Sequence, residues 1–281
     1  MAALHEITAG QVVAIDGKTL RRSFDAASST AVIHMVSAWA AANHISLGQV
    51  VTDEKSNEIT AIPKLLEVLE IKGCLVTIDA MGCQREIAEK IVNQQAGYVL
   101  AVKDNQPHLH QAVHDFFSEH LEDDCDSISC HRFESYEKGH GRVDDRYYYL
   151  AKLPDDFPLK EKWMGLKAIG MAVTVTKHSN GKHSDGVRYY ITSRYMSGEK
   201  FAKAVRGHWG IENSLHWQLD VTFGEDQSRI RKGHADVNFS LLRRTALSLL
   251  KNNKTEKVGV KNKRFCAAWD DDYLLQVVCG K

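Results

Sequence analysis

Two aspartates occupy similar places in the sequence. Asp16 lies between a short apolar run and Gly17, and Asp79 lies between another apolar run and Gly82. Each aspartate is predicted to end a strand, where a carboxylate is open to a ligand outside the sheet. Two converging carboxylates repel each other unless a cation lies between them, and their oxygens suit Mg²⁺ or Mn²⁺. Each aspartate alone also fits a turn residue that accepts backbone N–H bonds.

A third carboxylate lies in a predicted helix. His208 and His216 lie four residues before and after Glu212, so helical spacing puts the three side chains on one face. This face could hold a metal ion, although zinc sites usually have a different set of ligands. The same spacing also fits an amphipathic helix that only packs, and the sequence leaves both interpretations open.

Apolar periodicity predicts the elements that position these residues. Strands are expected at 11–20, 31–42 and 44–52, antiparallel because the connections are short. Further along the chain, strands at 74–82 and 97–105 alternate with two helices. The first helix is expected to begin near Thr60 with Pro63 in its first turn, and the second to cover 84–94. This order predicts a mixed α/β sheet flanked by helices.

The second half of the chain is predicted to begin and end with helices. A helix at 106–124 precedes strand patterns that fill 127–194, which we interpret as a β-rich insertion. A helix from 197 to about 218 then carries Glu212, and a last helix covers 236–250. The last helix is predicted to bury Phe239, Leu242, Ala246 and Leu249. Residues 251–264 are predicted to be loosely ordered.

Composition excludes several classes of protein. The 281 residues are 43% hydrophobic and 26% charged, which is typical of a globular chain, and no apolar run approaches a membrane span. Six scattered cysteines favour reduced thiols and a cytoplasmic location. Net charge is zero, but 203–264 holds 13 Lys and Arg against 6 Asp and Glu, or +7. That segment is either a phosphate-contacting face or a solvated helical surface.

Five strings carry a resemblance to a known family. They are AIDGKTLRRS at 14–23, TIDAMGCQREIAEKI at 77–91, YVLAVKDNQ at 98–106, HGRVDDR at 140–146 and HWGIENSLHWQLDVTFGED at 208–226. In these strings the chain resembles DDE-type transposases of bacterial insertion sequences, in the branch that includes the H-repeat-associated proteins of Rhs elements. The resemblance implies one RNase H-like catalytic domain over 1–281. Its core would cover about 8–105 and 197–250, with a β-rich insertion at 106–196 and a basic tail at 251–281.

The resemblance also implies an activity. Asp16, Asp79 and Glu212 would be the catalytic triad and would bind two Mg²⁺ or Mn²⁺ ions, which activate a water or a DNA 3′-hydroxyl for attack on a phosphodiester. The expected function is DNA strand cleavage and strand transfer in transposition. The expected partner is double-stranded DNA, at insertion-sequence ends and at the target, bound by a homodimer. The protein would be cytoplasmic, associated with the bacterial nucleoid, with no membrane partner.

Basic residues near these motifs are candidates for DNA contacts. Lys103 is favoured, because it ends the strand expected beside Asp79. The full set is Lys18, Arg21, Arg22, Lys103, Arg142, His208, Arg229, Arg231 and Lys232.

The chain departs from the family pattern in two respects. Val205, His208 and Leu219 occupy the places where related transposases carry Tyr, Arg and Lys around the glutamate. Only fifteen residues precede Asp16, where branch members carry several dozen, so a shortened copy is expected. The alternative hypotheses are a catalytically silent remnant that binds DNA only and a histidine-rich metal-binding protein.

Overall fold

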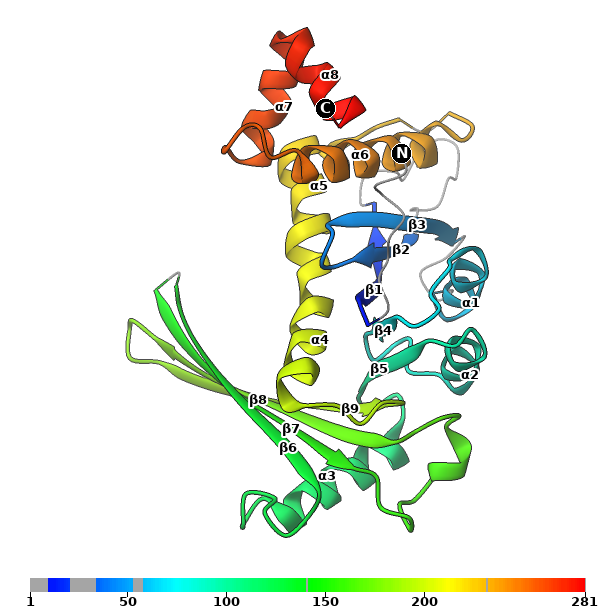
Figure 1. The fold of residues 1–281 in the computed structure, drawn as a ribbon, viewed down its shortest axis with the longest axis vertical. Coiled ribbons are helices and arrows are strands. Elements are labelled where there is room, and N and C mark those ends of the chain that lie inside the picture. The colour runs from blue at the N-terminus through cyan, green and yellow to red at the C-terminus, as the bar shows by residue number, and fades with distance from the viewer. Residues whose placement is uncertain (1–9, 21–33, 53–57, 140, 231, 281) are drawn as a thin grey trace. The chain divides into compact units, whose positions relative to one another are not determined.

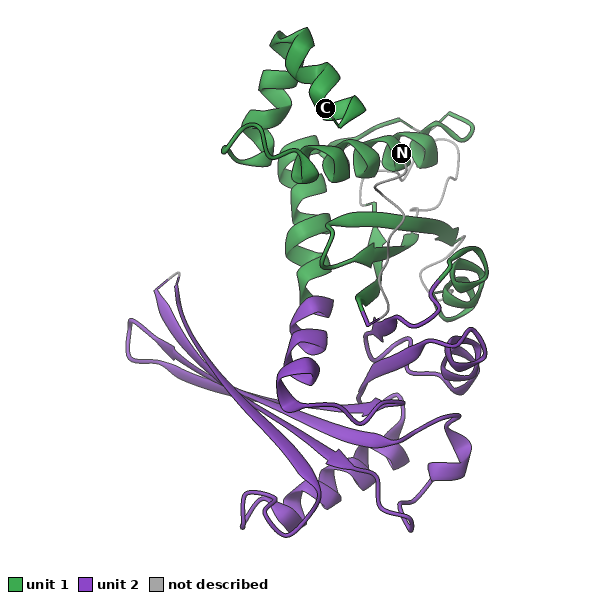
Figure 2. Cartoon of the chain, in the orientation of Figure 1, with its two compact units in different colours: residues 1–7, 11–70, 209–281 green, residues 8–10, 71–208 purple. Residues whose placement is uncertain are grey.

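The computed structural model describes residues 10–20, 34–52, 58–139, 141–230 and 232–280. Contacts divide the chain into two compact units, which Figure 2 shows in different colours. Unit 1 is built mainly from Gln11–Glu70 and Trp209–Lys281, and unit 2 mainly from Ile71–His208. Each unit is described separately below.

Three antiparallel strands form the sheet of unit 1. They are β1 (Val12–Thr19), β2 (His34–Ala40) and β3 (Ile45–Thr52), in the order β3-β2-β1. The antiparallel pairing is confirmed, because connections as short as that between β2 and β3 can only return the chain alongside itself. Residues 31–33 of the second expected strand lie outside the described residues.

Asp16 does not end its strand, so the prediction of a turn there is wrong. β1 continues through Gly17 to Thr19, and Asp16 pairs with Ser37 of β2. Gly17 is needed because the side chains of His34 and Glu58 approach its backbone closely. A Cβ atom at that position would lie 2.7 Å from His34 Nε2 and 2.6 Å from Glu58 Cδ. The glycine therefore makes room for the ion pair between His34 and Glu58, which packs against this face of β1.

Helix α1 (Glu58–Val68) begins at least two residues earlier than predicted. Pro63 consequently lies inside the helix and not in its first turn. Ile62 and Leu65 are buried, and Leu65 Cδ1 would lie 3.3 Å from a Cβ atom at Gly48 of β3. The helix covers one face of the three-stranded sheet through these contacts.

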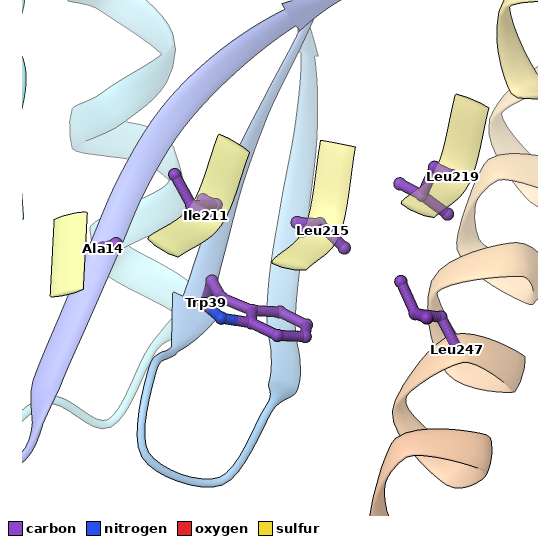
Figure 3. Packing of buried hydrophobic residues seen from close by; sticks show 6 residues of the cluster. All are labelled: Ala14, Trp39, Ile211, Leu215, Leu219 and Leu247. Atoms are coloured by element: carbon purple, nitrogen blue, oxygen red, sulfur yellow. The ribbon is translucent and has the colours of Figure 1, made fainter. Parts of the chain in front are cut away.

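A long helical segment runs from residue 198 to residue 223. It consists of α4 (Gly198–Ile211), the π-helical turn η4 (Glu212–His216) and α5 (Trp217–Phe223). Within unit 1 it presents Ile211, Leu215 and Leu219 at intervals of four residues. Figure 3 shows this stripe beside Ala14 of β1 and Trp39 of β2, and all five side chains are at most 1% exposed. The stripe fixes the rotation of the helix that carries Glu212.

Helix α6 (Ala235–Asn252) buries a different face from the predicted one. Phe239 is 44% exposed and Leu242 is 61% exposed, whereas Ser240, Arg244 and Leu247 are fully buried. The inward face is partly polar because a buried carboxylate, described below, binds Arg244. Apolar periodicity alone was therefore wrong for Phe239 and Leu242, whereas the predicted Ala246 and Leu249 are half-buried and Leu249 packs against the cluster of Leu250.

Part of segment 251–264 is also more regular than predicted, because residues 260–264 belong to α7 (Val260–Trp269). Helix α8 (Asp271–Cys279) follows it. Asp270 caps α8, accepting hydrogen bonds from the backbone N–H groups of Asp272 and Tyr273. Tyr273 and Val277 pack with Leu250 in a small cluster that ties α8 to α6.

Unit 2 contains a mixed sheet. Its strands lie in the order β4-β5-β9-β8-β7-β6, with β4 and β5 parallel and the other pairs antiparallel. The strands are β4 (Leu75–Ile78), β5 (Gly97–Val102), β6 (Cys130–Gly139), β7 (Arg142–Lys152), β8 (Ala168–His178) and β9 (His183–Thr192). The helices are α2 (Arg85–Asn93) and α3 (Pro107–His120), together with most of α4 and the short 3₁₀ turn η3 (Lys160–Lys162). The predicted strand-rich segment between the helices is confirmed.

Aromatic side chains hold α4 on the sheet of unit 2. Phe201 is fully buried, with its ring edge-on to Tyr148 and Tyr190 at centroid distances of 6.4 and 5.6 Å. Gly170 of β8 leaves the space for this ring, because a Cβ atom there would lie 2.9 Å from Phe201 Cε2. Both units are thus α/β arrangements in which helices flank a sheet (Figure 1). No helix of the described residues is long and apolar enough to cross a bilayer.

The close approach at Gly17 can be tested by adding one methyl group. We expect Gly17→Ala to lower the free energy of unfolding by about 1–3 kcal/mol, because the new Cβ atom displaces the Glu58 carboxylate from His34. Chemical denaturation of the purified protein measures this change. Gly186→Ala is the matched control, since Gly186 also lies in a strand and has open space around it. Equal stability of the two variants would contradict the interpretation.

Candidate active site

The three predicted carboxylates come from both units. Asp16 and Glu212 belong to unit 1, and Asp79 belongs to unit 2. Among the described residues, no group of three or more His, Cys, Asp or Glu side chains is close enough to hold a metal ion. The surroundings of each carboxylate are therefore described within its own unit.

Asp16 lies on the face of β1 that packs against the long helix. Side chains alternate along a strand, so Ala14, Asp16 and Lys18 share one face. Asp16 Oδ2 lies 3.4 Å from His216 Nδ1, and both side chains are largely buried, with 18% and 12% exposed. The imidazole of His216, which lies on the helix, thus limits the conformations available to the Asp16 carboxylate.

Glu212 opens the π-helical turn of the long helix. Its side chain is exposed, and it lies one turn before His216, the residue that contacts Asp16. A π-helical turn is rare and is frequently found at functional sites, because the extra residue changes the direction in which side chains point. Ile211 and Leu215 stay buried on either side of Glu212, so the wider turn leaves the apolar stripe intact.

Asp79 directly follows β4, which confirms its predicted place at a strand end. Its Oδ1 atom accepts hydrogen bonds from the backbone N–H groups of Met81 at 3.0 Å and Gly82 at 3.3 Å. Asn105 Nδ2 donates to the carbonyl oxygen of Ala80 at 2.6 Å and fixes the same turn. The carboxylate is thus held by a rigid loop at the end of a buried strand.

Lys103 comes directly after β5, the parallel neighbour of β4, and its side chain is exposed. Parallel strands end at the same edge of a sheet, so Lys103 and Asp79 lie at one edge of unit 2. This agrees with the expected position of Lys103. Its contact with DNA stays a prediction.

His208 is partly buried in unit 2. Its Nδ1 atom lies 3.4 Å from Thr77 Oγ1 on β4. Burial lowers the pKa of His208, although the nearby Asp79 carboxylate acts in the opposite direction. A neutral imidazole carries no positive charge and therefore contributes less to phosphate binding than a protonated one. The predicted DNA contact of His208 stays a prediction.

Lys18 lies in a network of buried charges and is only 8% exposed. It forms ion pairs with Asp220 and, at 3.0 Å, with Glu225 Oε2. Glu225 Oε1 accepts further hydrogen bonds from Arg244 Nη1 at 3.0 Å and from Ser240 Oγ at 2.7 Å. Lys18 could reach a phosphate only by giving up the partners that stabilise its charge, and its predicted DNA contact stays untested.

The other predicted basic residues have varied surroundings. Arg142, Arg229 and Lys232 are exposed, and Arg142 Nε lies 3.3 Å from Asp144 Oδ2. Arg21, Arg22 and Arg231 lie outside the described residues.

The three carboxylates have the chemistry that a divalent metal requires. Asp16, Asp79 and Glu212 offer hard oxygen atoms, which Mg²⁺ and Mn²⁺ prefer. The two N–H bonds to Asp79 engage only its Oδ1 atom in the recorded contacts. The donor set therefore fits these ions.

Sequence reasoning missed several partners of these residues. It placed His216 on the Glu212 face but gave it no contact with Asp16, since the sequence contains no signal that pairs residues 200 positions apart. The contact of Thr77 with His208, across 131 positions, was missed for the same reason. The Glu225–Arg244 pair is only 19 positions apart, and it was missed because apolar periodicity does not select buried charged residues. Strand alternation does place Lys18 on the same face as Asp16, so the sequence could have indicated that Lys18 faces the same partner element as Asp16.

Comparison with known proteins decides the family. A family model described as "Transposase DDE domain" matches residues 8–249. The chain belongs to this transposase DDE domain family.

Relatives in the family cover the whole chain. It is 45% identical over 283 residues to "Putative transposase YncI" of Escherichia coli O157:H7, which spans all of this chain and 72% of that protein. It is 42% identical over 288 residues to "H repeat-associated putative transposase YhhI" of Escherichia coli strain K12, covering 74% of that protein. These findings confirm the resemblance drawn from the five strings. Membership in the family implies DNA as partner and nuclease or transposition activity.

Breaking the buried ion pair of unit 1 should destabilise the fold. We expect Arg244→Ala to lower the free energy of unfolding by about 3–5 kcal/mol, because Glu225 is left buried without its principal partner. Arg243→Ala is the matched control, since Arg243 is the neighbouring residue but partly exposed, over the ring of Phe239. Its cost should stay below about 1 kcal/mol. Similar losses in both variants, measured by urea denaturation, would contradict the importance of the pair.

The same network predicts a pH dependence. Burial raises the pKa of Glu225, but Arg244 and Lys18 outweigh this effect and hold it below its ordinary value. A depressed pKa contributes stability that is complete above about pH 4.3 and is lost as the pH falls through the folded-state pKa. The stability difference between wild type and Glu225→Gln should therefore shrink as the pH is lowered from 5 to 3. Denaturation at several pH values measures it, and a constant difference would disprove the assignment.

Proposed function

We propose that the protein cleaves DNA strands and joins them to target DNA, with Asp16, Asp79 and Glu212 as catalytic residues that bind divalent metal ions. The observation that carries the proposal is the contact of Asp16 with His216, one helical turn from Glu212. Two acidic residues of the predicted triad thus belong to adjoining parts of one unit. The family of the chain supports the same chemistry.

The proposed reaction is phosphoryl transfer. In cleavage, a water oxygen bonds to phosphorus and the bond from phosphorus to the 3′-oxygen breaks, which leaves a 3′-hydroxyl and a 5′-phosphate. In joining, that 3′-hydroxyl loses its proton and its oxygen bonds to phosphorus in a phosphodiester of the target, while the bond from that phosphorus to the target's own 3′-oxygen breaks and leaves a 3′-hydroxyl on the target strand. Two Mg²⁺ or Mn²⁺ ions held by the three carboxylates would supply the charge that activates the attacking oxygen and stabilises the leaving oxygen.

The surrounding residues restrict the carboxylates before metal binds. His216 lies against Asp16, so it limits the rotation of that side chain on β1. The backbone N–H groups of Met81 and Gly82 orient the carboxylate of Asp79. Rigid placement of this kind reduces the reorganisation needed during the reaction. Lys103, at the same edge as Asp79, is the proposed phosphate contact nearest to the site.

The remaining parts of the proposal concern fold and assembly. We infer an RNase H-like core, interrupted by the β-rich segment before the helix of Glu212. The partner is double-stranded DNA, bound by a homodimer in the cytoplasm. The antiparallel β1–β2–β3 sheet and the parallel β4–β5 pair are compatible with this core.

Conservative replacement of the triad tests the catalytic role. We expect Asp16→Asn, Asp79→Asn and Glu212→Gln each to reduce Mg²⁺-dependent nicking of supercoiled plasmid at least about 100-fold, since metal coordination supplies several kcal/mol to the transition state. Removing the metal with a chelator should abolish nicking by the wild type. Glu199→Gln is a control on the same helix, and Asp155→Asn is a surface control in unit 2; both should nick like the wild type.

The outcomes separate the hypotheses. Wild-type protein that binds duplex DNA but does not nick it with Mg²⁺ or Mn²⁺ would favour the catalytically silent remnant. Nicking that survives all three substitutions would disprove the assignment of the site. Binding of DNA by Asp16→Asn with wild-type affinity would show that the substitution removes chemistry and not the fold.

A further inference from the structure

Two hairpins of unit 2 end side by side. The β6–β7 hairpin turns between Gly139 and Arg142, and the β8–β9 hairpin turns between Lys177 and His183. Arg142 pairs with His178 across β7 and β8, and the backbone N–H of Ser179 donates to the carbonyl oxygen of Gly141 at 2.9 Å. We call the described residues among 138–142 and 177–183 the hairpin tip. Figure 1 shows this end of the sheet extending away from α3 and α4.

The hairpin tip carries positive charge without carboxylates. Its described residues include four Lys and Arg and no Asp or Glu. The cations are Lys138, Arg142, Lys177 and Lys182. All four are exposed. In a chain with zero net charge, such a cluster is a local feature that favours an anionic partner.

Two of the four cations have carboxylate partners further down the strands. Arg142 Nε lies 3.3 Å from Asp144 Oδ2, and Lys177 Nζ lies 3.1 Å from Asp145 Oδ2. Within the described residues, no ion pair is recorded for Lys138. The same holds for Lys182, so these two lysines are the cations that can bind a partner without breaking a recorded contact.

The carboxylates nearest to the tip reduce its field only in part. Glu137 precedes Lys138 but is bound by Arg206 at 3.0 Å and by Arg146 at 2.8 Å. Asp185 lies on β9, two residues beyond the tip, and is exposed. Two arginines therefore already neutralise Glu137. Asp185 is a single carboxylate beside four cations, so the tip keeps an excess of positive charge.

The tip also has the shape and the donors for a phosphate backbone. A Cβ atom at Gly139 or Gly181 would meet nothing within 4 Å, so the turns present bare backbone. Ser179 and Asn180 add small polar side chains at the exposed turn. Lysine, arginine and serine side chains and backbone N–H groups are common donors to DNA phosphates.

We propose that the hairpin tip is a DNA-binding surface, at which Lys138 and Lys182 contact the phosphates of duplex DNA without reading its sequence. The inference rests on the proposed function, because it takes DNA as the partner. It adds a binding element that is separate in the sequence from the three carboxylates and from the basic segment at 203–264. Binding at the tip therefore contributes affinity and not base recognition.

The salt dependence of binding tests the tip directly. The wild type and Lys138→Gln/Lys182→Gln are titrated against a fluorescently labelled duplex of arbitrary sequence at several salt concentrations. We expect the slope of log K against log salt to fall by up to about 2 in the variant, since each phosphate contact contributes about 0.9. Lys152→Gln/Lys162→Gln is the matched control: it also removes two exposed lysines from unit 2, and Lys152 lies at the opposite end of β7. Its slope should equal that of the wild type.

The outcomes distinguish this inference from the proposed function. Equal slopes for the two double variants would overturn the role of the tip while leaving plasmid nicking as evidence for catalysis. A reduced slope for the tip variant, together with unchanged nicking by Asp16→Asn, would support the tip and refute the catalytic assignment. A wild type that does not bind duplex DNA at low salt would overturn both.

Discussion

The packing of one helical stripe on two strands determines the geometry of unit 1. Leu215 lies at the centre of the stripe and is fully buried in one cluster with Trp39 and Ala14, and Figure 3 shows it beside the Trp39 ring. Because the helix cannot rotate without exposing these side chains, the residues next to the stripe have fixed directions. Glu212 and His216 are such residues, and His216 contacts Asp16 of β1. The apolar core thus sets the register in which His216 meets Asp16.

A second set of contacts extends this register along β1. Asp16 contacts His216, and two positions later Lys18 contacts Asp220, which lies four residues after His216. Contacts two residues apart on the strand therefore match contacts four residues apart on the helix. Glu225 binds both Lys18 of β1 and Arg244 of α6, so it links the strand to that helix. A polar row beside an apolar stripe specifies one alignment of helix and strand, since a shifted alignment would bury charges without partners.

Local patterns in the sequence predicted the features that depend on near neighbours. Asp79 was correctly placed at a strand end, because a buried strand and the turn after it are encoded within eight residues. Asp16 was not, because Gly17 serves a contact with Glu58, some forty positions away, and in sequence it looks like a turn. The inward face of α6 was missed for a similar reason, since Arg244 is buried by its pairing with Glu225. Hydrophobic periodicity assigns polar residues to the surface, so a buried polar residue such as Arg244 can be recognised only when its partner is known.

The sequence separation of the buried charges has a consequence for synthesis of the chain. Lys18 is made early, but its partner Glu225 follows 207 residues later. At about 5–20 residues per second, translation takes roughly 10–40 s to cover that distance. Unit 2 lies almost entirely within this interval, between Ile71 and His208. On the ribosome, β1 can pair with β2 soon after synthesis, but Lys18 waits for Glu225 while the whole of the intervening unit is produced. The helical part of unit 1 can therefore pack on this strand only after unit 2 has been made.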